Sequence, residues 1–136
     1  MHLHNHSEYS LLDGMSNLDK MVNKVKENNQ KAIAITDHGN MYGAIDFYKT
    51  SNKYGIKPII GLEAYVAPVD SLSKAPNEKT PYHITLLSQN ETGYKNLMKL
   101  VTHSNINGFY YKPRIDRMVL EQYNEGLIVL SGCPSS

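Results

Sequence analysis

The regular alternation of short apolar runs with amphipathic stretches is the feature that most constrains the fold. Residues 32–35 (Ala-Ile-Ala-Ile) are bounded by polar residues, which is typical of a strand buried on both faces. Further strands are expected over 2–6, 57–66, 83–87 and 127–130, and helices over about 17–29, 41–54, 90–103 and from Asp116 onward. Strands that alternate with helices favour parallel βα units, so we expect an α/β fold, either a doubly wound sheet or a barrel.

Residues at the ends of the expected helices support these boundaries. Side chains suited to helix N-termini precede three of them, and these are Ser16, Asn40 and Asn90. Gly55 suits the C-terminal end of the second helix. The inward face of that helix is expected to carry Met41, Ala44, Ile45, Phe47 and Tyr48.

Length and charge limit the classes of protein. The 136 residues make one domain or part of one, and the formal net charge of +1 gives this segment alone no electrostatic means of gripping DNA, RNA or a membrane. A single cysteine excludes an internal disulfide framework and favours a reducing, cytoplasmic setting. No apolar run reaches the length of a membrane span, so no membrane contact is expected.

The first six residues hold three histidines in alternation. In a strand His2, His4 and His6 would share one face, about 6.6 Å apart, so two neighbouring imidazoles can converge on one metal. The interleaved Leu3 and Asn5 argue against a purification tag. Imidazole suits Zn, Fe, Ni and Cu, with Mn where carboxylates join.

Each expected strand carries a metal-competent residue that we assign to its carboxyl end or to the residues just beyond it. In parallel α/β folds chemistry gathers at the carboxyl ends of the strands, and we expect nitrogen, oxygen and sulfur donors to share that rim. Besides His4 and His6, these donors are Asp13, Asp37, His38, Glu63, His83 and Cys133. Asp37 is expected to orient an imidazole rather than to bind metal itself.

Each donor also has an ordinary structural explanation. His38 could close a turn, Glu63 could pair with Lys57, and His83 could be a hydrogen-bonded core residue. Cys133 could be a small buried hydrophobic residue. His103 lies in a helix outside the pattern, where a surface or packing role is expected.

Five short motifs match a known family. They are His4-Asn5-His6-Ser7, Thr36-Asp37-His38-Gly39, Gly61-Leu62-Glu63, Tyr82-His83 and Ser131-Gly132-Cys133. With them the chain resembles the polymerase-and-histidinol-phosphatase (PHP) domain. Longer stretches over 6–14, 55–61 and 108–116 resemble the branch of that family found at the amino terminus of the alpha subunit of bacterial DNA polymerase III.

The resemblance implies a distorted, TIM-like (β/α)7 barrel with up to three divalent metals, Zn, Mn or Fe, in a rim cleft. It implies that His4, His6 and Glu63 hold a first metal, with Glu63 also bridging to a second. His83 and Cys133 would complete the second site, and Asp13 and His38 would hold a third metal. His2 becomes a neighbour rather than a ligand.

The resemblance also implies phosphoester hydrolysis, and in polymerases a metal-dependent 3′–5′ exonuclease within a DNA-directed DNA polymerase. Lys112 and Arg114 are candidates for a phosphate contact, with a solvated or packing role as the alternative. A non-catalytic module that supports the polymerase is the second interpretation. A stand-alone phosphatase of small esters such as histidinol phosphate is the third, and amidohydrolases share the imidazole pair but need different later ligands.

The family pattern ends with an Asp-x-His motif that nothing after Cys133 supplies. We therefore expect residues 1–136 to be the N-terminal part of a PHP domain, truncated to about five βα units, with fewer metals and no activity of its own. Expected partners are the remainder of the polymerase chain, DNA through that chain, and the separate proofreading subunit. Exposed strand edges also predict self-association.

Overall fold

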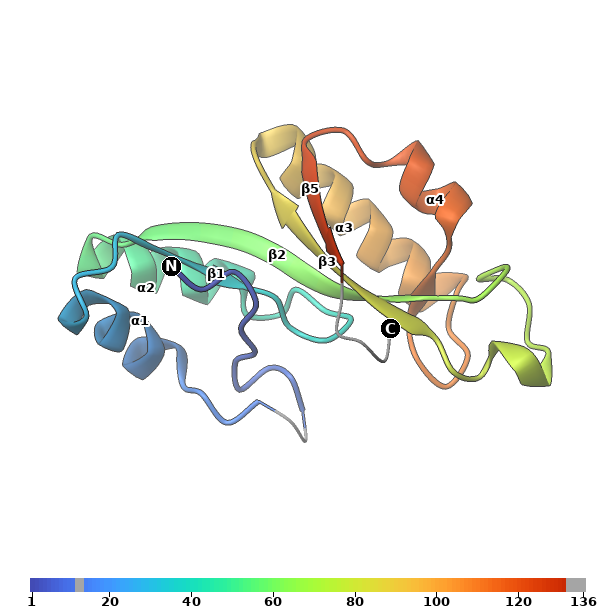
Figure 1. The fold of residues 1–136 in the computed structure, drawn as a ribbon, viewed down its shortest axis with the longest axis horizontal. Coiled ribbons are helices and arrows are strands. Elements are labelled where there is room, and N and C mark those ends of the chain that lie inside the picture. Colours follow the sequence, from blue (N-terminus) through green and yellow to red (C-terminus); the bar gives the residue numbers. More distant parts are fainter. Residues whose placement is uncertain (12–13, 132–136) are drawn as a thin grey trace.

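The computed structural model describes residues 1–11 and 14–131 as a mixed α/β structure (Figure 1). The elements follow the order α1 (Leu18–Glu27), β1 (Ala32–Ile35), α2 (Ala44–Tyr54), β2 (Lys57–Val66), the 3₁₀ turn η1 (Pro76–Glu78), β3 (Tyr82–Ser88), α3 (Glu91–Ile106), β4 (Arg114–Ile115), α4 (Arg117–Gln122) and β5 (Leu127–Ser131). The α/β class is confirmed, and the strands and helices from residue 17 onward lie close to their predicted ranges.

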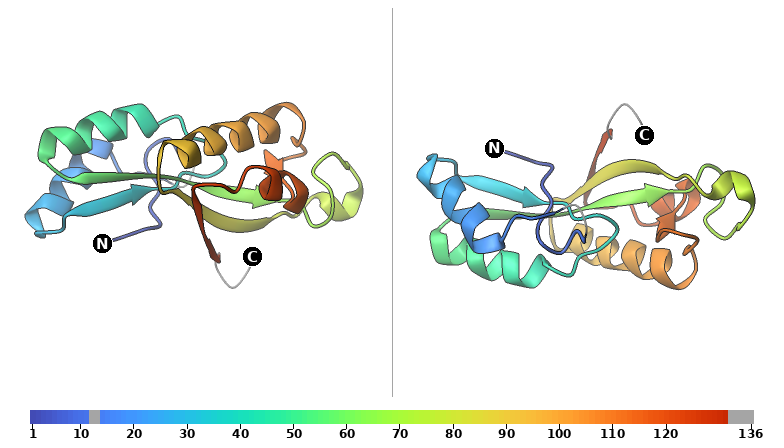
Figure 2. Two further views of the ribbon diagram at one scale, coloured as in Figure 1. Left: turned by 90° about the horizontal axis from the view of Figure 1, so that it is seen from above. Right: turned by 90° about the horizontal axis from the view of Figure 1, so that it is seen from below.

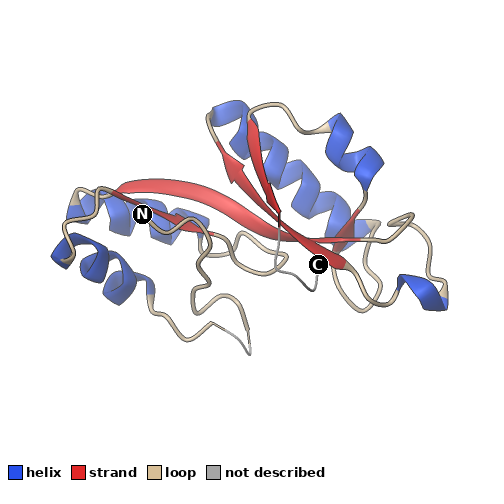
Figure 3. Cartoon of the chain, viewed as in Figure 1, coloured by secondary structure: helices blue, strands red, loops and turns tan. Residues whose placement is uncertain are grey.

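Strand β2 is the long central strand of a five-stranded sheet in which β1, β2, β3 and β5 lie side by side (Figure 3). Its first part pairs in parallel with β1, and its second part pairs antiparallel with β3 and in parallel with β4. β5 is antiparallel to β3. The predicted all-parallel arrangement is therefore wrong. Only a loop with a 3₁₀ turn joins β2 to β3, and without a crossover helix the chain returns antiparallel.

Helices α2 and α3 cover the same face of the sheet at opposite ends of β2 (Figure 2). One apolar cluster joins α1, β1 and α2 and includes Val22, Ile33 and Phe47; the other joins β2, β3 and α3 and includes Leu62, Leu86 and Leu97. Because side chains alternate along a strand, Leu62 and its neighbour Ala64 face α3 and leave the intervening side chains on the opposite face. That opposite face carries the polar residues described below.

The predicted strand over 2–6 is not formed. His2 O and Asn5 O accept backbone bonds from Ala34 and Thr36, so the segment lies beside β1. The side chain of Asn5 interrupts the pairing, because its Nδ2 donates to Ala34 O while its backbone N–H donates to Thr36 Oγ1. The terminal histidines are therefore presented by an irregular segment.

Two helix starts also differ from prediction. Asn17, not Ser16, caps α1, and its side chain accepts from the backbone N–H groups of Asp19 and Lys20. α2 begins at Ala44 because Asn40 closes a turn onto the N–H of Tyr42 rather than capping the helix.

The ends and faces of α2 and α3 were predicted in part. Gly55 ends α2 in the left-handed conformation, at φ 71°, and Asn90 caps α3, both as predicted. Ile45 and Tyr48 are more than half exposed, so their predicted inward positions are wrong. No helix among the described residues is long and apolar enough to cross a membrane.

Candidate metal centre

Glu63 is the acidic residue around which the polar face of β2 is arranged. Its side chain points away from α3, yet the residue is only 6% exposed. A buried carboxylate without partners is costly, so it requires donors from other segments. Those donors come from the amino-terminal segment and from the loop after β1.

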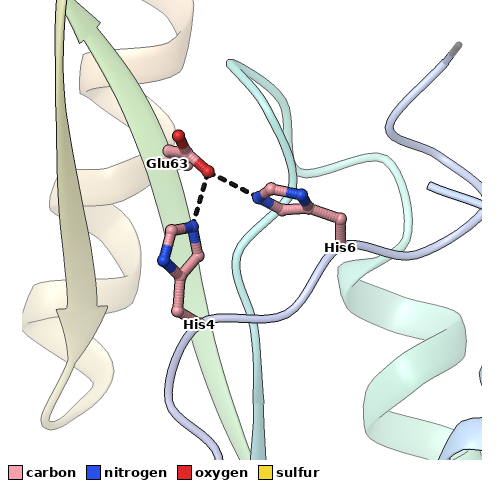
Figure 4. Close-up of side chains that lie close together, drawn as sticks. All are labelled: His4, His6 and Glu63. Carbon is pink, nitrogen blue, oxygen red and sulfur yellow. Dashed lines mark hydrogen bonds and ion pairs between the residues drawn. The ribbon is translucent and has the colours of Figure 1, made fainter. Parts of the chain in front are cut away.

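His4 and His6 both direct their imidazoles at one oxygen of Glu63 (Figure 4). Their Nε2 atoms lie 2.6 and 2.5 Å from Glu63 Oε2. Within the described part of the chain, these three residues form a group whose possible ligand atoms all lie within 4.8 Å of one another. They are the same three residues that the resemblance assigned to a first metal.

His38 extends this group from the carboxyl end of β1. Its Nδ1 lies 3.4 Å from Glu63 Oε2, and its ring centroid lies 3.9 Å from that of His6. The backbone brings the two segments together, because the N–H groups of Gly39 and Glu63 bond to the carbonyls of Glu63 and Asp37. Three imidazoles from two segments therefore surround one carboxylate.

Electrostatics keep the carboxylate ionised. Burial raises the pKa of Glu63, but the hydrogen bonds from His6 and His4, helped by the charge of His38, outweigh it and bring the pKa to about 2. The chemistry of this donor set fits a metal ion, since imidazole nitrogen and carboxylate oxygen are ligands that Zn²⁺ and other transition metals accept. Binding would release the protons that the imidazoles now donate.

Asp37 holds the surrounding loop in place. Its buried carboxylate accepts from Ser7 N, Ser7 Oγ and Ser10 Oγ at 2.6–2.7 Å. Ser10 Oγ in turn accepts from the backbone N–H of His38 at 3.1 Å. These bonds fix the backbone that carries His6 and His38, and the role of Asp37 in orienting an imidazole stays a prediction.

His83 lies on the same face as Glu63, but at the amino end of β3 rather than at the predicted carboxyl end of a parallel strand. The antiparallel register places it opposite Tyr65. Its ring centroid lies 4.9 Å from that of Tyr65 and 6.4 Å from that of His38. Burial lowers the pKa of His83, and the charges of His38, Lys112 and His4 act in the same direction against the opposing effect of Glu63. A lowered pKa favours the neutral imidazole, which is the form that binds metal.

The structure does not bring the other histidines into the cluster, and two predicted ligands are not described. Asp13 and Cys133 lie outside the described residues. His2 is exposed and is not one of the three clustered donors. His103 Nε2 lies 2.9 Å from Ser71 Oγ in a separate polar network, in line with its expected packing role.

Lys112 and Arg114 behave differently. Lys112 is exposed, and its Nζ lies 5.3 Å from the ring centroid of Tyr65. Arg114 is fully buried, and its guanidinium donates to the carbonyls of Gly108, Glu78, Ser71 and Ser73. The predicted phosphate contact of Arg114 is therefore wrong, because its donors are committed to the backbone of two loops.

Sequence reasoning missed three residues near this centre. The ring of Tyr65 lies beside those of both His38 and His83, and its position two residues after Glu63 on one strand is a signal that could have revealed it. Ser7 and Ser10 anchor Asp37 through tertiary contacts that no local pattern shows.

Comparison with known proteins agrees with this geometry. Residues 2–136 match the PHP domain. The chain belongs to the PHP domain family. The alpha subunit of DNA polymerase III from Borreliella burgdorferi is 53% identical over 135 residues, which cover 98% of this chain and 12% of that protein. The Thermus aquaticus alpha subunit is 46% identical over 137 residues, covering 97% of this chain and 11% of that protein. The chain thus spans about an eighth of the length of these relatives.

Solved structures show the fold. A proposed metal-dependent phosphoesterase from Bifidobacterium adolescentis aligns with a TM-score of 0.54 at 19% identity, over 75% of this chain and 32% of that one. An amidohydrolase from Chromobacterium violaceum aligns with the same TM-score at 22% identity and the same coverages. Both confirm the arrangement of elements in this PHP domain segment.

Proposed function

We propose that this chain contributes a metal-binding phosphoesterase centre to the alpha subunit of a bacterial DNA polymerase III, where it removes nucleotides from the 3′ end of DNA. The observation that carries the proposal is the convergence of His4, His6 and Glu63 within 4.8 Å. The relatives' identity as polymerase alpha subunits supports the biological setting. The neighbour described as a metal-dependent phosphoesterase supports the reaction class.

The proposed metals are Zn, Mn or Fe. His4, His6 and Glu63 would hold one, Glu63 and His83 with Cys133 a second, and His38 with Asp13 a third. Bound metals would supply an activated water and neutralise phosphate charge. The chain's own contribution is to hold an ionised Glu63 among imidazoles, to fix His38 through Ser10 and Asp37, and to offer the cation of Lys112 to the substrate.

A metal-content measurement tests the proposal. The purified chain is loaded with Zn²⁺ or Mn²⁺, dialysed and analysed by mass spectrometry, beside the variants His4→Ala and His2→Ala. We expect His4→Ala to lower metal content and His2→Ala, an exposed histidine outside the donor cluster, to leave it unchanged. Equal metal content in both variants, or no metal in the unaltered chain, would overturn the proposal.

The catalytic part is tested in the full-length polymerase chain that carries this segment. Digestion of a 5′-labelled single strand should be abolished by EDTA and by Glu63→Gln. If the chain binds metal but no EDTA-sensitive cleavage is observed, the catalytic part of the proposal is wrong and the domain supports the polymerase without catalysis.

The rest of the barrel, the location of the domain and its partners are part of the same proposal. The open sheet would form part of a (β/α)7 barrel completed by the remainder of the polymerase chain in the cytoplasm, with the proofreading subunit as a further partner. Ile128 and Val129 on the edge strand β5 are 41% and 50% exposed. These exposed apolar side chains support the proposal that the remainder of the polymerase chain covers this edge. Pairing of this edge with a second copy remains the alternative for the isolated chain.

A further inference from the structure

A groove of about 240 Å³ opens beside the metal centre, between the loop that follows β1 and the loop that precedes β4. Its sides carry two aromatic rings, Tyr42 and Phe109, which are 68% and 51% exposed. Sites for drug-sized ligands are larger, at about 300–1,000 Å³. The groove therefore suits one planar group rather than a long ligand.

The two loops that form the groove are held against each other. Gly39 has a φ of +62°, and a Cβ on it would lie 2.8 Å from Pro113 Cγ and 3.1 Å from Tyr65 Cε2. Asn40 donates to the carbonyls of Tyr9 and His38 and accepts from the backbone N–H of Tyr42. These contacts place the loop after β1 against Pro113 on one side and bond it to the amino-terminal segment on the other.

His38 connects the groove to the donor cluster. His38 lines the groove, and its Nδ1 lies 3.4 Å from Glu63 Oε2. Lys112 also lines it, with Nζ 5.3 Å from the ring centroid of Tyr65. Two exposed aromatic rings, one cation and the histidine that contacts the donor cluster therefore line the same groove.

We propose that this groove binds the base of the 3′-terminal nucleotide of a single DNA strand, with the base against Tyr42 and Phe109 and its phosphate toward Lys112. This inference rests on the proposed function and deepens it by naming what holds the substrate. Stacking on aromatic side chains accepts any base, because every base has a π-face. Such tolerance is what removal of successive nucleotides requires.

The test compares two short fluorescein-labelled thymidylate strands that differ only at the 3′ end, where one carries thymine and the other an abasic sugar. Binding is followed by fluorescence anisotropy in EDTA, so that neither metal nor cleavage contributes. We expect the chain to bind the thymine-ended strand at least about fivefold more tightly, the lower end of what one base–aromatic stack contributes.

Phe109→Ala and Tyr42→Ala should each remove most of this preference. Tyr48→Ala is the matched control, because Tyr48 is 54% exposed on α2 and lies outside the groove, and it should keep the preference. Lys112→Met should weaken both strands alike, since a phosphate contact does not read the base. Equal binding of the two strands by the unaltered chain, or an unchanged preference in both aromatic variants, would overturn the inference.

The measurement in EDTA also separates this inference from the proposed function. If the preference for the thymine-ended strand depends on Tyr42 and Phe109, base binding in the groove is supported even where the metal-content test fails. If the chain binds metal but has equal affinity for the two strands, the proposed binding of a base in the groove is wrong and the phosphoesterase proposal is unaffected.

Discussion

Two buried glutamates, Glu63 and Glu78, are held in opposite ways. Glu78 is 2% exposed and lies 3.7 Å from the guanidinium of Arg114, which is itself tied to four backbone carbonyls. Glu63 is 6% exposed, but its partners are imidazoles from His4, His6 and His38. Both carboxylates are buried, and the difference lies in what neutralises them.

The difference separates a structural ion pair from a candidate metal site. The guanidinium of Arg114 donates to carbonyls of two loops and lies beside Glu78, so it holds these loops together. Imidazole nitrogens are common ligands of transition metals, so the partners of Glu63 can also bind a metal ion. Burial of a charge alone therefore does not mark a candidate functional site, whereas a buried carboxylate surrounded by imidazoles is a candidate metal site.

Removing Arg114 should give the largest effect on stability. Arg114→Met leaves Glu78 and four carbonyls without their cation, and we expect the free energy of unfolding to fall by about 3–5 kcal/mol. Urea unfolding followed by circular dichroism measures it. Arg117→Met is the control, because Arg117 is 90% exposed and pairs with the exposed Glu121, and it should leave unfolding unchanged. Equal effects of the two substitutions would remove the structural role given to Arg114.

Asp37→Asn should lower the free energy of unfolding by less than Arg114→Met does, and it should also lower the affinity for Zn²⁺. The amide cannot accept all three bonds from Ser7 and Ser10, so we expect a loss of about 1–3 kcal/mol in urea unfolding. Because the loop positions His6 and His38, Zn²⁺ affinity should fall by about 10–100-fold in a competition titration. Asp46→Asn, at an exposed bond to Tyr9, is the control. Unaltered Zn²⁺ affinity in Asp37→Asn would show that the loop does not support the centre.

Asp116→Asn should have the smallest effect on stability, and this effect should depend on pH. Burial raises its pKa, but bonds from Ser71 and from the N–H of Val119, with the charge of His103, outweigh it and leave the pKa lowered. A lowered folded-state pKa adds stability above the ordinary value of 3.8, and that stability disappears as the pH falls below it. Urea midpoints of the unaltered chain should therefore drop more steeply below about pH 4 than those of Asp116→Asn. Parallel pH curves for the two proteins would contradict this contribution.

Local patterns predicted the elements well and their pairing less well. The apolar run at 32–35 and the end of α2 at Gly55 follow from residue type and period, which are local properties. The direction of β3 does not, because it depends on a loop that lacks a crossover helix. The terminal histidines were expected on a strand, but a tertiary bond from the Asn5 side chain interrupts that pairing.

The candidate centre was predicted in residue type and only partly in geometry. Glu63 stood out as one carboxylate in an apolar run, and the alternation of His4 and His6 suggested convergence, which the structure shows. The partners of Asp37 and the burial of Arg114 depend on segments far apart in sequence. Sequence alone could not distinguish an arginine aimed at phosphate from one aimed at backbone carbonyls.

The most direct test of the contrast between Glu63 and Glu78 is the change in melting temperature on adding Zn²⁺ to the unaltered chain, Glu63→Gln and Glu78→Gln. A ligand at 100 times its dissociation constant stabilises the folded state by about 2.7 kcal/mol. We expect the unaltered chain and Glu78→Gln to show the same upward shift, the latter from a lower starting temperature, and Glu63→Gln to show none. An equal shift in Glu63→Gln would contradict the assignment of Glu63 to a metal centre.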